Sequence, residues 1–158
     1  MRIIGWNIRA GGGRRVDRIA RALCRWQPDV VALSEFRGTP PSAELADRLR
    51  RQGLRFQSGT TDAGEPARNA LLVASLWPVR RLPLESGGPD EPTRWLPVRV
   101  EAPQPFLLGA MHVPNRVTRR KFPYLDAARE QARRWRDERA LLIGDTNSGV
   151  PGLDEQSP

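Results

Sequence analysis

Polar residues of the types used in phosphate chemistry occur at well-separated places in this 158-residue sequence. Glu35 and Asp145 offer the carboxylate oxygens that Mg²⁺ prefers, while the amides of Asn7 and Asn147 can orient a ligand or a water molecule. His112, the only histidine, can donate a proton or a hydrogen bond to a phosphate oxygen. Hydrolysis of a phosphate ester needs a cation, a base for the water and in-line positioning. These residue types therefore favour a Mg²⁺ site, with Mn²⁺ as an alternative, that acts on phosphate.

The same residues lie at or just beyond the ends of predicted strands. Short apolar runs predict these strands over residues 2–8, 30–33, 106–111 and 140–143. In open α/β sheets, ligands gather outside the carboxyl ends of the strands. We therefore expect the polar side chains to meet in one pocket, although they are far apart in the sequence.

Amphipathic helices are predicted between these strands. Apolar residues recur at helical spacing over residues 14–26, and the opposite face carries arginines typical of a solvated helix surface. Ser42 is placed to cap a second helix that ends near Gln52, before the stop signal Gly53. The inward face of a third helix is predicted at Leu125, Ala128, Ala132 and Trp135.

Further strands complete an α/β fold class in a single domain over residues 1–158. Residues 70–76 read as a buried strand, and residues 95–100 alternate as a half-exposed strand would. The strand, helix, strand order at the N-terminus is typical of α/β proteins. The length suits one domain with its own hydrophobic core.

The charge of the chain favours anionic partners. The formal net charge is +8 and the pI is about 11.3, values that attract phosphate-rich molecules such as nucleic acid. Arg116 follows His112 closely and is placed to approach a phosphate backbone. Cys24 is the only cysteine, and no signal stretch or membrane-spanning run is present, so a cytoplasmic protein with no membrane partner is expected.

Four segments resemble successive motifs of the endonuclease/exonuclease/phosphatase superfamily, the group that contains exonuclease III and DNase I. They read RIIGWNIRAGGG, DVVALSEFRG, LLGAMHVPN and LLIGDTNSG, and their order and approximate spacing match the superfamily. The resemblance implies a DNase I-like four-layer α/β sandwich, in which two packed mixed sheets are flanked by helices. It also implies a Mg²⁺-dependent phosphodiesterase or nuclease that attacks phosphorus with water.

The resemblance also assigns roles to single residues. Asn7 would lie beside the metal and hold the scissile phosphate, and Glu35 would be the principal Mg²⁺ ligand. His112 would contact the phosphate, Asp145 would orient or deprotonate the water or assist the leaving group, and Asn147 would hold a phosphate oxygen. Asn69, before the ALLVAS strand, falls where many members carry a polar residue near the substrate.

The sequence departs from the superfamily after its GDTN motif. Members usually continue to a further aspartate and a Ser-Asp-His motif that supplies the general base, whereas this sequence stops at Pro158. The expectation is a sandwich that lacks its C-terminal strands and associates through an exposed sheet edge. The alternatives are a catalytically incomplete fragment or pseudoenzyme that retains metal or nucleic-acid binding, and a small α/β binding module whose motif matches arise by chance.

Overall fold

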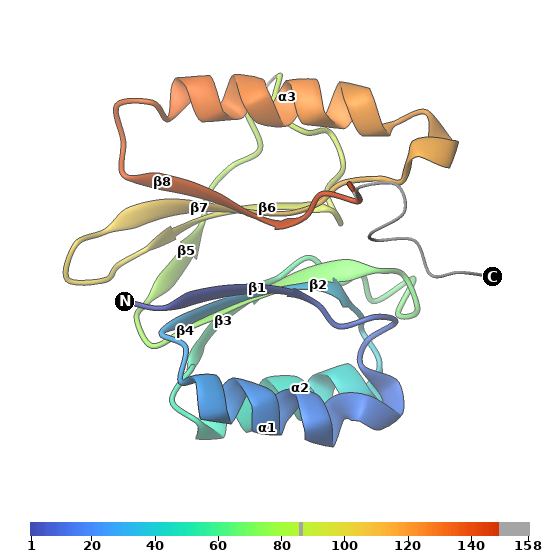
Figure 1. Cartoon of the computed structure of the whole chain (residues 1–158), viewed down its shortest axis with the longest axis vertical. Helices are drawn as coiled ribbons and strands as arrows, with labels where there is room; N and C mark the ends of the chain where they lie inside the picture. The colour runs from blue at the N-terminus through green and yellow to red at the C-terminus, as the bar shows by residue number, and fades with distance from the viewer. Residues whose placement is uncertain (86, 149–158) are drawn as a thin grey trace.

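Two four-stranded sheets pack face to face and are flanked by helices on both outer sides (Figure 1). This arrangement belongs to a computed structural model that describes residues 1–85 and 87–148. In Figure 1 the layers run from α1 and α2 at the bottom, through the two sheets, to α3 at the top. The predicted four-layer α/β sandwich is confirmed.

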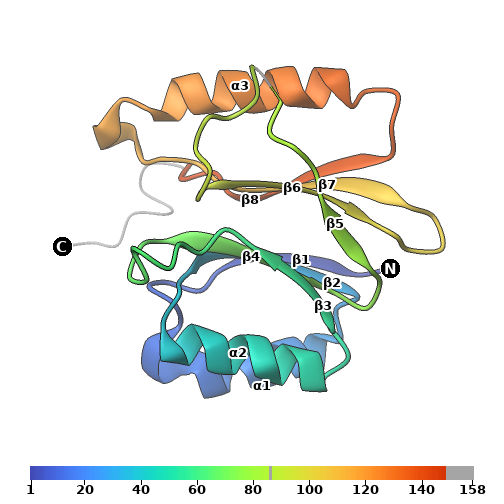
Figure 2. The same ribbon diagram turned by 180° about the vertical axis from the view of Figure 1, so that it is seen from behind.

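The first sheet is built from the N-terminal half of the chain. Its strands, in spatial order, are β1 (Ile3–Asn7), β2 (Val30–Phe36), β4 (Ala70–Ser75) and β3 (Phe56–Gly59). β1 and β2 are parallel and are connected through a short 3₁₀ turn, η1 (Gly13–Arg15), and α1 (Val16–Trp26). α2 (Pro40–Arg51) packs beside α1 on the outer face of this sheet, as the view from behind also shows (Figure 2).

The second sheet follows in the sequence and has the order β5-β6-β7-β8. Its strands are β5 (Val79–Arg81), β6 (Trp95–Val100), β7 (Phe106–His112) and β8 (Ala140–Asp145). A 3₁₀ turn, η2 (Arg116–Thr118), and α3 (Lys121–Arg134) connect β7 to the parallel strand β8. Because each crossover places a helix on the outer face, the inner faces of the two sheets remain free to pack together.

Apolar side chains fill the space between each pair of layers. Val30 and Val73 of the first sheet meet Leu96 and Leu108 of the second, and all four residues are fully buried. A separate cluster packs α1 and α2 against the first sheet, and another packs α3 against the second. Burial of this apolar surface stabilises the sandwich and fixes the strand ends that carry the polar residues.

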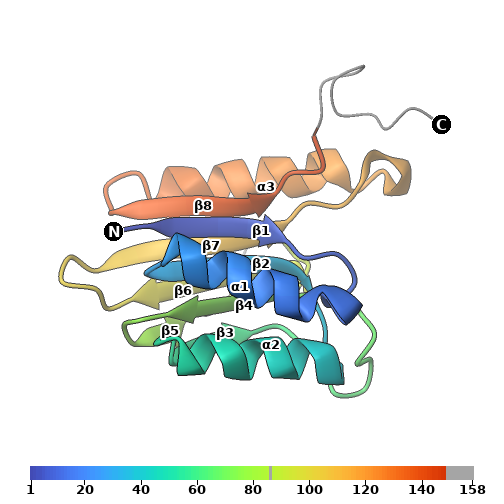
Figure 3. The ribbon, with the colours of Figure 1, turned by 60° about the horizontal axis from the view of Figure 1, so that its bottom comes forward.

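β1 and β8 are edge strands of their sheets and lie on the same side of the sandwich (Figure 3). Gly5 allows them to approach, because a Cβ at this position would lie 2.7 Å from Cγ1 of Ile143. Leu141 of β8 is 37% exposed at this open side. The sheet edge whose exposure was predicted from the sequence is therefore the β8 edge of the second sheet, and it lies beside β1.

Several local predictions were wrong. Ser42 does not cap α2, which begins at Pro40 after Thr39; its buried hydroxyl bonds the loop after β1 instead. β6 is almost wholly buried rather than half-exposed, because the first sheet and α3 cover its two faces. Ala132 is exposed and Gln131 is buried in its place, because the buried face of α3 runs through Tyr124, Ala128 and Gln131. The short edge strands β3 and β5 were not predicted.

Within the part of the chain that the structure describes, no helix has both the length and the apolar character needed to cross a bilayer.

Candidate active site

The strand ends of both sheets meet at one end of the sandwich. Asn7 is the last residue of β1, and His112 and Asp145 are the last residues of β7 and β8, where they are register partners. Glu35 lies in β2, next to the partner of Asn7 in the parallel pair. The structure thus brings four of the sequence-predicted residues to the same place.

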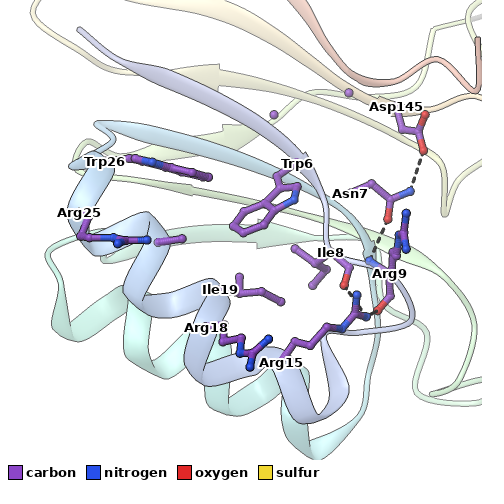
Figure 4. Close-up of a pocket in the computed structure, with 13 residues that line it drawn as sticks. Trp6, Asn7, Ile8, Arg9, Arg15, Arg18, Ile19, Arg25, Trp26 and Asp145 are labelled. Carbon is purple, nitrogen blue, oxygen red and sulfur yellow. Dashed lines mark hydrogen bonds between the residues drawn. The ribbon is translucent and has the colours of Figure 1, made fainter. Parts of the chain in front are cut away.

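Asn7 joins the two sheets at the centre of this site. Its Nδ2 donates to Oε1 of Glu35 at 2.9 Å and to Oδ2 of Asp145 at 2.7 Å. The second of these bonds crosses from the first sheet to the second, as Figure 4 shows. Its Oδ1 accepts the backbone N–H of Arg9 at 2.9 Å. Every polar atom of the amide therefore has a partner, and the side chain fixes the separation of the two carboxylates.

Glu35 reaches the site from an irregular position in β2. The register with β4 shifts between Ser34 and Phe36, and Glu35 has a left-handed backbone with φ of 55°. Such a bulge redirects a side chain relative to the regular strand. The turn after β1 then holds the residue twice, because Ala10 N–H donates to Oε2 at 2.8 Å and Gly11 N–H donates to the carbonyl at 2.7 Å.

The surroundings of Glu35 favour its ionised form. Partial burial acts to raise the pKa of this carboxyl, but the hydrogen bonds from Asn7 and Ala10, with smaller contributions from His112 and Arg37, outweigh it and leave the pKa lowered. The carboxylate is therefore charged at neutral pH. A charged carboxylate beside an amide is a suitable oxygen ligand for a hard divalent cation.

Asp145 is oriented by the backbone around it. Asn147 N–H donates to Oδ1 at 2.8 Å, and the preceding Gly144 has φ of 149°. A Cβ at Gly144 would lie 1.8 Å from the carbonyl oxygen of Met111, so only glycine lets β8 pair with β7 at this point. The close approach of β7 and β8 thus explains why the GDTN motif has a glycine at this position.

Asn147 lies beside the site, but its side-chain amide is hydrogen-bonded to the backbone of another loop. Nδ2 donates to the carbonyl of Val113 at 2.5 Å, and its own carbonyl accepts Nζ of Lys121 at 2.5 Å. In this arrangement Asn147 connects the loop after β8 to the loop after β7 and to α3. The sole lysine of the chain was not predicted to have such a role, because a contact between loops leaves no local pattern.

His112 is buried, and its Nε2 lies 3.9 Å from Oδ2 of Asp145. Burial, followed by the charge of Arg94, lowers the pKa of the imidazole, and the opposing effects of Asp145 and Glu35 do not compensate. The ring is therefore neutral at neutral pH. Nδ1 has no hydrogen-bond partner among the described residues, which leaves a buried nitrogen for a ligand or a water molecule.

Arg94, just before β6, and Tyr124 of α3 support His112. The backbone N–H of His112 donates to the Arg94 carbonyl at 2.9 Å, and the Tyr124 hydroxyl donates to the same carbonyl at 2.7 Å. The Arg94 guanidinium donates to the His112 carbonyl at 3.3 Å. Sequence reasoning missed both residues, since their role depends on the pairing of β6 with β7.

The two remaining predicted residues lie at the margin. Asn69 precedes β4, and its Oδ1 accepts a hydrogen bond from Nε of Arg37 at 2.7 Å. Arg37 follows Glu35 closely in the sequence. Arg116 is exposed in η2, and no contact joins it to the other site residues in the described structure. Their assignment as substrate-binding residues stays a prediction.

The donor set fits a hard cation that keeps much of its water. Among the residues described, no cluster of three or more His, Cys, Asp or Glu side chains is arranged to hold a metal. Glu35, Asp145 and the Asn7 amide supply two carboxylates and one amide instead. Mg²⁺ is commonly bound by one or two carboxylates and several water molecules, so this sparse set suits it better than Zn²⁺.

Comparison with known proteins identifies the family. A profile of the Endonuclease/Exonuclease/phosphatase family matches residues 4–154. The chain belongs to this family. Curated proteins, in contrast, give no match.

Solved structures of this family share the fold over nearly the whole chain. An endonuclease/exonuclease/phosphatase from Beutenbergia cavernae is 24% identical with a TM-score of 0.63, covering 98% of this chain and 50% of its own. An AP endonuclease from Archaeoglobus fulgidus is 16% identical with a TM-score of 0.61, covering 98% and 59%. D. rerio TDP2, complexed with a single strand DNA product, is 21% identical with a TM-score of 0.62, covering 94% and 61%.

This chain therefore spans between half and two thirds of the length of these three family structures. At such identities the likeness establishes the shared architecture. The placement of Asn7, Glu35, His112 and Asp145 rests on the geometry described above.

Proposed function

We propose that this chain carries the site of a Mg²⁺-dependent hydrolase that cleaves phosphate esters, with phosphodiesters as the preferred class. The observation that carries the proposal is the Asn7 amide, which bonds both Glu35 and Asp145 beside a neutral, buried histidine. The first sheet supplies two of these residues and the second sheet supplies the others. Hence the packing of the sandwich itself sets the geometry of the site.

Each residue has a distinct task in this proposal. Glu35, with Asn7 and Asp145 beside it, would hold Mg²⁺, which supplies charge neutralisation at the phosphate oxygens. The neutral imidazole of His112 would donate a hydrogen bond to a phosphoryl oxygen as negative charge develops there. Asp145 accepts hydrogen bonds at both oxygens and would orient the attacking water or take its proton.

A nucleic-acid phosphodiester is our preferred substrate. The net charge of +8 favours encounter with a polyanion. Two of the structural neighbours, the AP endonuclease and the TDP2 solved with a single strand DNA product, support the same class. From the sequence alone, with Cys24 as the only cysteine, we place this activity in the cytoplasm.

The test is hydrolysis by the purified chain with and without Mg²⁺. A chromogenic phosphodiester and a labelled oligonucleotide serve as substrates, and EDTA removes the cation. We expect Glu35→Gln to lower the rate by about 100-fold or more, because it removes the charged oxygen ligand while retaining the shape. Glu138→Gln is the matched control, since Glu138 is an exposed carboxylate in the connection between α3 and β8, at the opposite end of β8 from Asp145.

Isothermal titration with Mg²⁺ separates this proposal from its alternative. A pseudoenzyme would bind the cation in a Glu35-dependent manner and hydrolyse nothing. Equal hydrolysis by the wild type and Glu35→Gln would contradict the role of Glu35 and therefore the proposed site. A chain whose Mg²⁺ binding is the same in both variants would be a binding module of another kind.

A further inference from the structure

The arginines of α1 differ from those of the other helices in their charge environment. Arg18, Arg21 and Arg25 of α1, and Arg14 in the turn before it, are exposed, and none of their side chains makes a hydrogen bond or an ion pair within the described residues. The only acid of α1, Asp17, bonds Arg48 of α2 instead. α1 therefore presents a stripe of positive charge that the fold does not neutralise.

Arginines on α2 and α3 show the opposite pattern. Apart from Arg51, they pair with carboxylates three or four residues earlier in the same helix, as in Arg48–Glu44, Arg50–Asp47, Arg129–Asp126 and Arg133–Glu130. Such pairs are typical of a solvated helix surface. The high arginine content of the chain therefore does not by itself explain why the stripe on α1 lacks partners.

A hollow of about 860 Å³ lies between this helix and β1. Arg15, Arg18 and Arg25 line it together with Trp6 and Trp26 (Figure 4). One end of the hollow reaches Asn7 and Asp145, and the other end reaches Trp26. Among the described residues that line it, Asp145, at the site, is the only acidic one.

Aromatic surface is available beside these charges. Trp26 is 42% exposed, and its ring centroid lies 5.2 Å from that of Trp6 at a tilt of 52°. Exposed indole faces stack on nucleic-acid bases, and arginines beside them attract the phosphates. From Arg18 to Arg25 the helix rises about 10 Å, and the turn η1 extends the stripe to Arg14, so the stripe can follow a strand of a few nucleotides.

We propose that the α1 stripe and the adjoining hollow form a track for single-stranded nucleic acid that leads the backbone to Asn7 and Asp145. The inference rests on the proposed function, because it names the substrate of that site. The arginines attract the phosphates, and Trp26, with Trp6 behind it, stacks a base. A rigid duplex keeps its bases stacked inside, so it would not use the tryptophans.

Binding without turnover tests the track. Fluorescence anisotropy of a short labelled single strand in EDTA gives the dissociation constant, measured over a range of about 50 to 200 mM salt. We expect the double variant Arg18→Ala with Arg25→Ala to bind at least about tenfold more weakly at the low-salt end. Its slope of log K against log salt should be less negative by about 1.4, because two phosphate contacts are lost.

The matched control removes the same charge elsewhere. Arg129→Ala with Arg133→Ala also lowers the net charge by two, but on α3, and it should leave the salt slope unchanged. Trp26→Ala should weaken binding by about fivefold or more, and Trp26→Phe should restore most of it. Thermal unfolding by circular dichroism checks that each variant is folded.

Failure of this inference is distinguishable from failure of the proposed function. Glu35→Gln should bind the strand at least as tightly as the wild type, because it removes a negative charge, even though it does not hydrolyse the strand. An equal loss of affinity in the α1 and α3 variants would overturn the track, as would equally tight binding of a duplex of the same sequence. Displacement of the strand by an acidic polypeptide of equal charge at the same concentration would also overturn it.

Discussion

At the scale of single residues, the ionisation of Glu35 couples the site to the stability of the fold. Its pKa in the folded chain lies below the usual value of 4.5, because hydrogen bonds from Asn7 and Ala10 outweigh the effect of burial. The charged form therefore stabilises the folded state. This contribution is fully present above the unfolded value and is lost as the pH falls through the lower folded pKa.

Glu35→Gln should remove this pH dependence. We expect the difference in unfolding free energy between wild type and variant to be constant above about pH 5 and to shrink at lower pH. Urea denaturation in EDTA from about pH 3 to pH 7 measures it. A difference that grows as the solution becomes more acidic would show that the folded state raises this pKa instead.

Gly144 is the residue whose replacement the backbone tolerates least. A Cβ there would meet the Met111 carbonyl oxygen at 1.8 Å, and neither β7 nor β8 can move without losing its pairing. We expect Gly144→Ala to destabilise the chain by about 3 kcal/mol or more, measured by urea denaturation.

Gly13→Ala is the control for Gly144→Ala. Gly13 also has a positive φ, of 47°, but a Cβ there would meet nothing within 4 Å. Its replacement should cost about 1 to 2 kcal/mol, the ordinary strain of a left-handed residue. Similar costs for the two variants would mean that the clash at Met111 is relieved.

At the scale of elements, Ser42 connects α2 to the turn that holds Glu35. Its hydroxyl donates to the Gly11 carbonyl at 3.1 Å and accepts the backbone N–H of Arg37 at 3.2 Å. Ser42→Ala leaves both backbone groups without this partner, so we expect a loss of about 1 to 3 kcal/mol in unfolding free energy. Thr61→Ala, at an exposed hydroxyl, should change it by less than about 0.5 kcal/mol. A neutral Ser42→Ala would mean that water replaces the hydroxyl.

The elements that sequence reasoning found are those with a local pattern. The apolar runs over residues 2–8 and 140–143 predicted the strands β1 and β8, because a short run of apolar residues is a signal that lies within the strand itself. The meeting of Asn7, Glu35, His112 and Asp145 followed from the rule for strand ends. The bulge at Glu35 did not, because it depends on the register with β4, a strand far along the chain.

Burial was harder to predict than the elements. The alternation in β6 suggested one solvated face, yet Trp95 and its neighbours are covered on both sides by layers that no local pattern reveals. The same reason explains Gln131, which is polar and buried, and whose amide donates to Glu85. The burial of a residue depends on which layers pack over it, whereas a short stretch of sequence gives information on its own layer alone.

At the scale of the whole molecule, we predict association through the side formed by β1 and β8. Among the described residues, β8 is the last strand of its sheet, and Leu141 in it is 37% exposed. Lysine on an edge strand opposes pairing with another chain. We therefore expect Leu141→Lys to lower the fraction of associated protein in sedimentation velocity at constant salt. Leu84→Lys, at another exposed leucine, is the control, and equal effects of the two variants would contradict an edge-specific contact.

The two sheets are also consecutive in the sequence, since the first uses strands from Ile3 to Ser75 and the second uses strands from Val79 to Asp145. A nascent chain leaves the ribosome from its N-terminus, so the first sheet can pair while the second is still being translated. The bond from Asn7 to Asp145 spans 138 positions, so it cannot form until β8 has been translated. A nascent chain of this protein thus holds Glu35 in place well before it can acquire the second carboxylate, and any metal-dependent cleavage begins only after β8 has emerged.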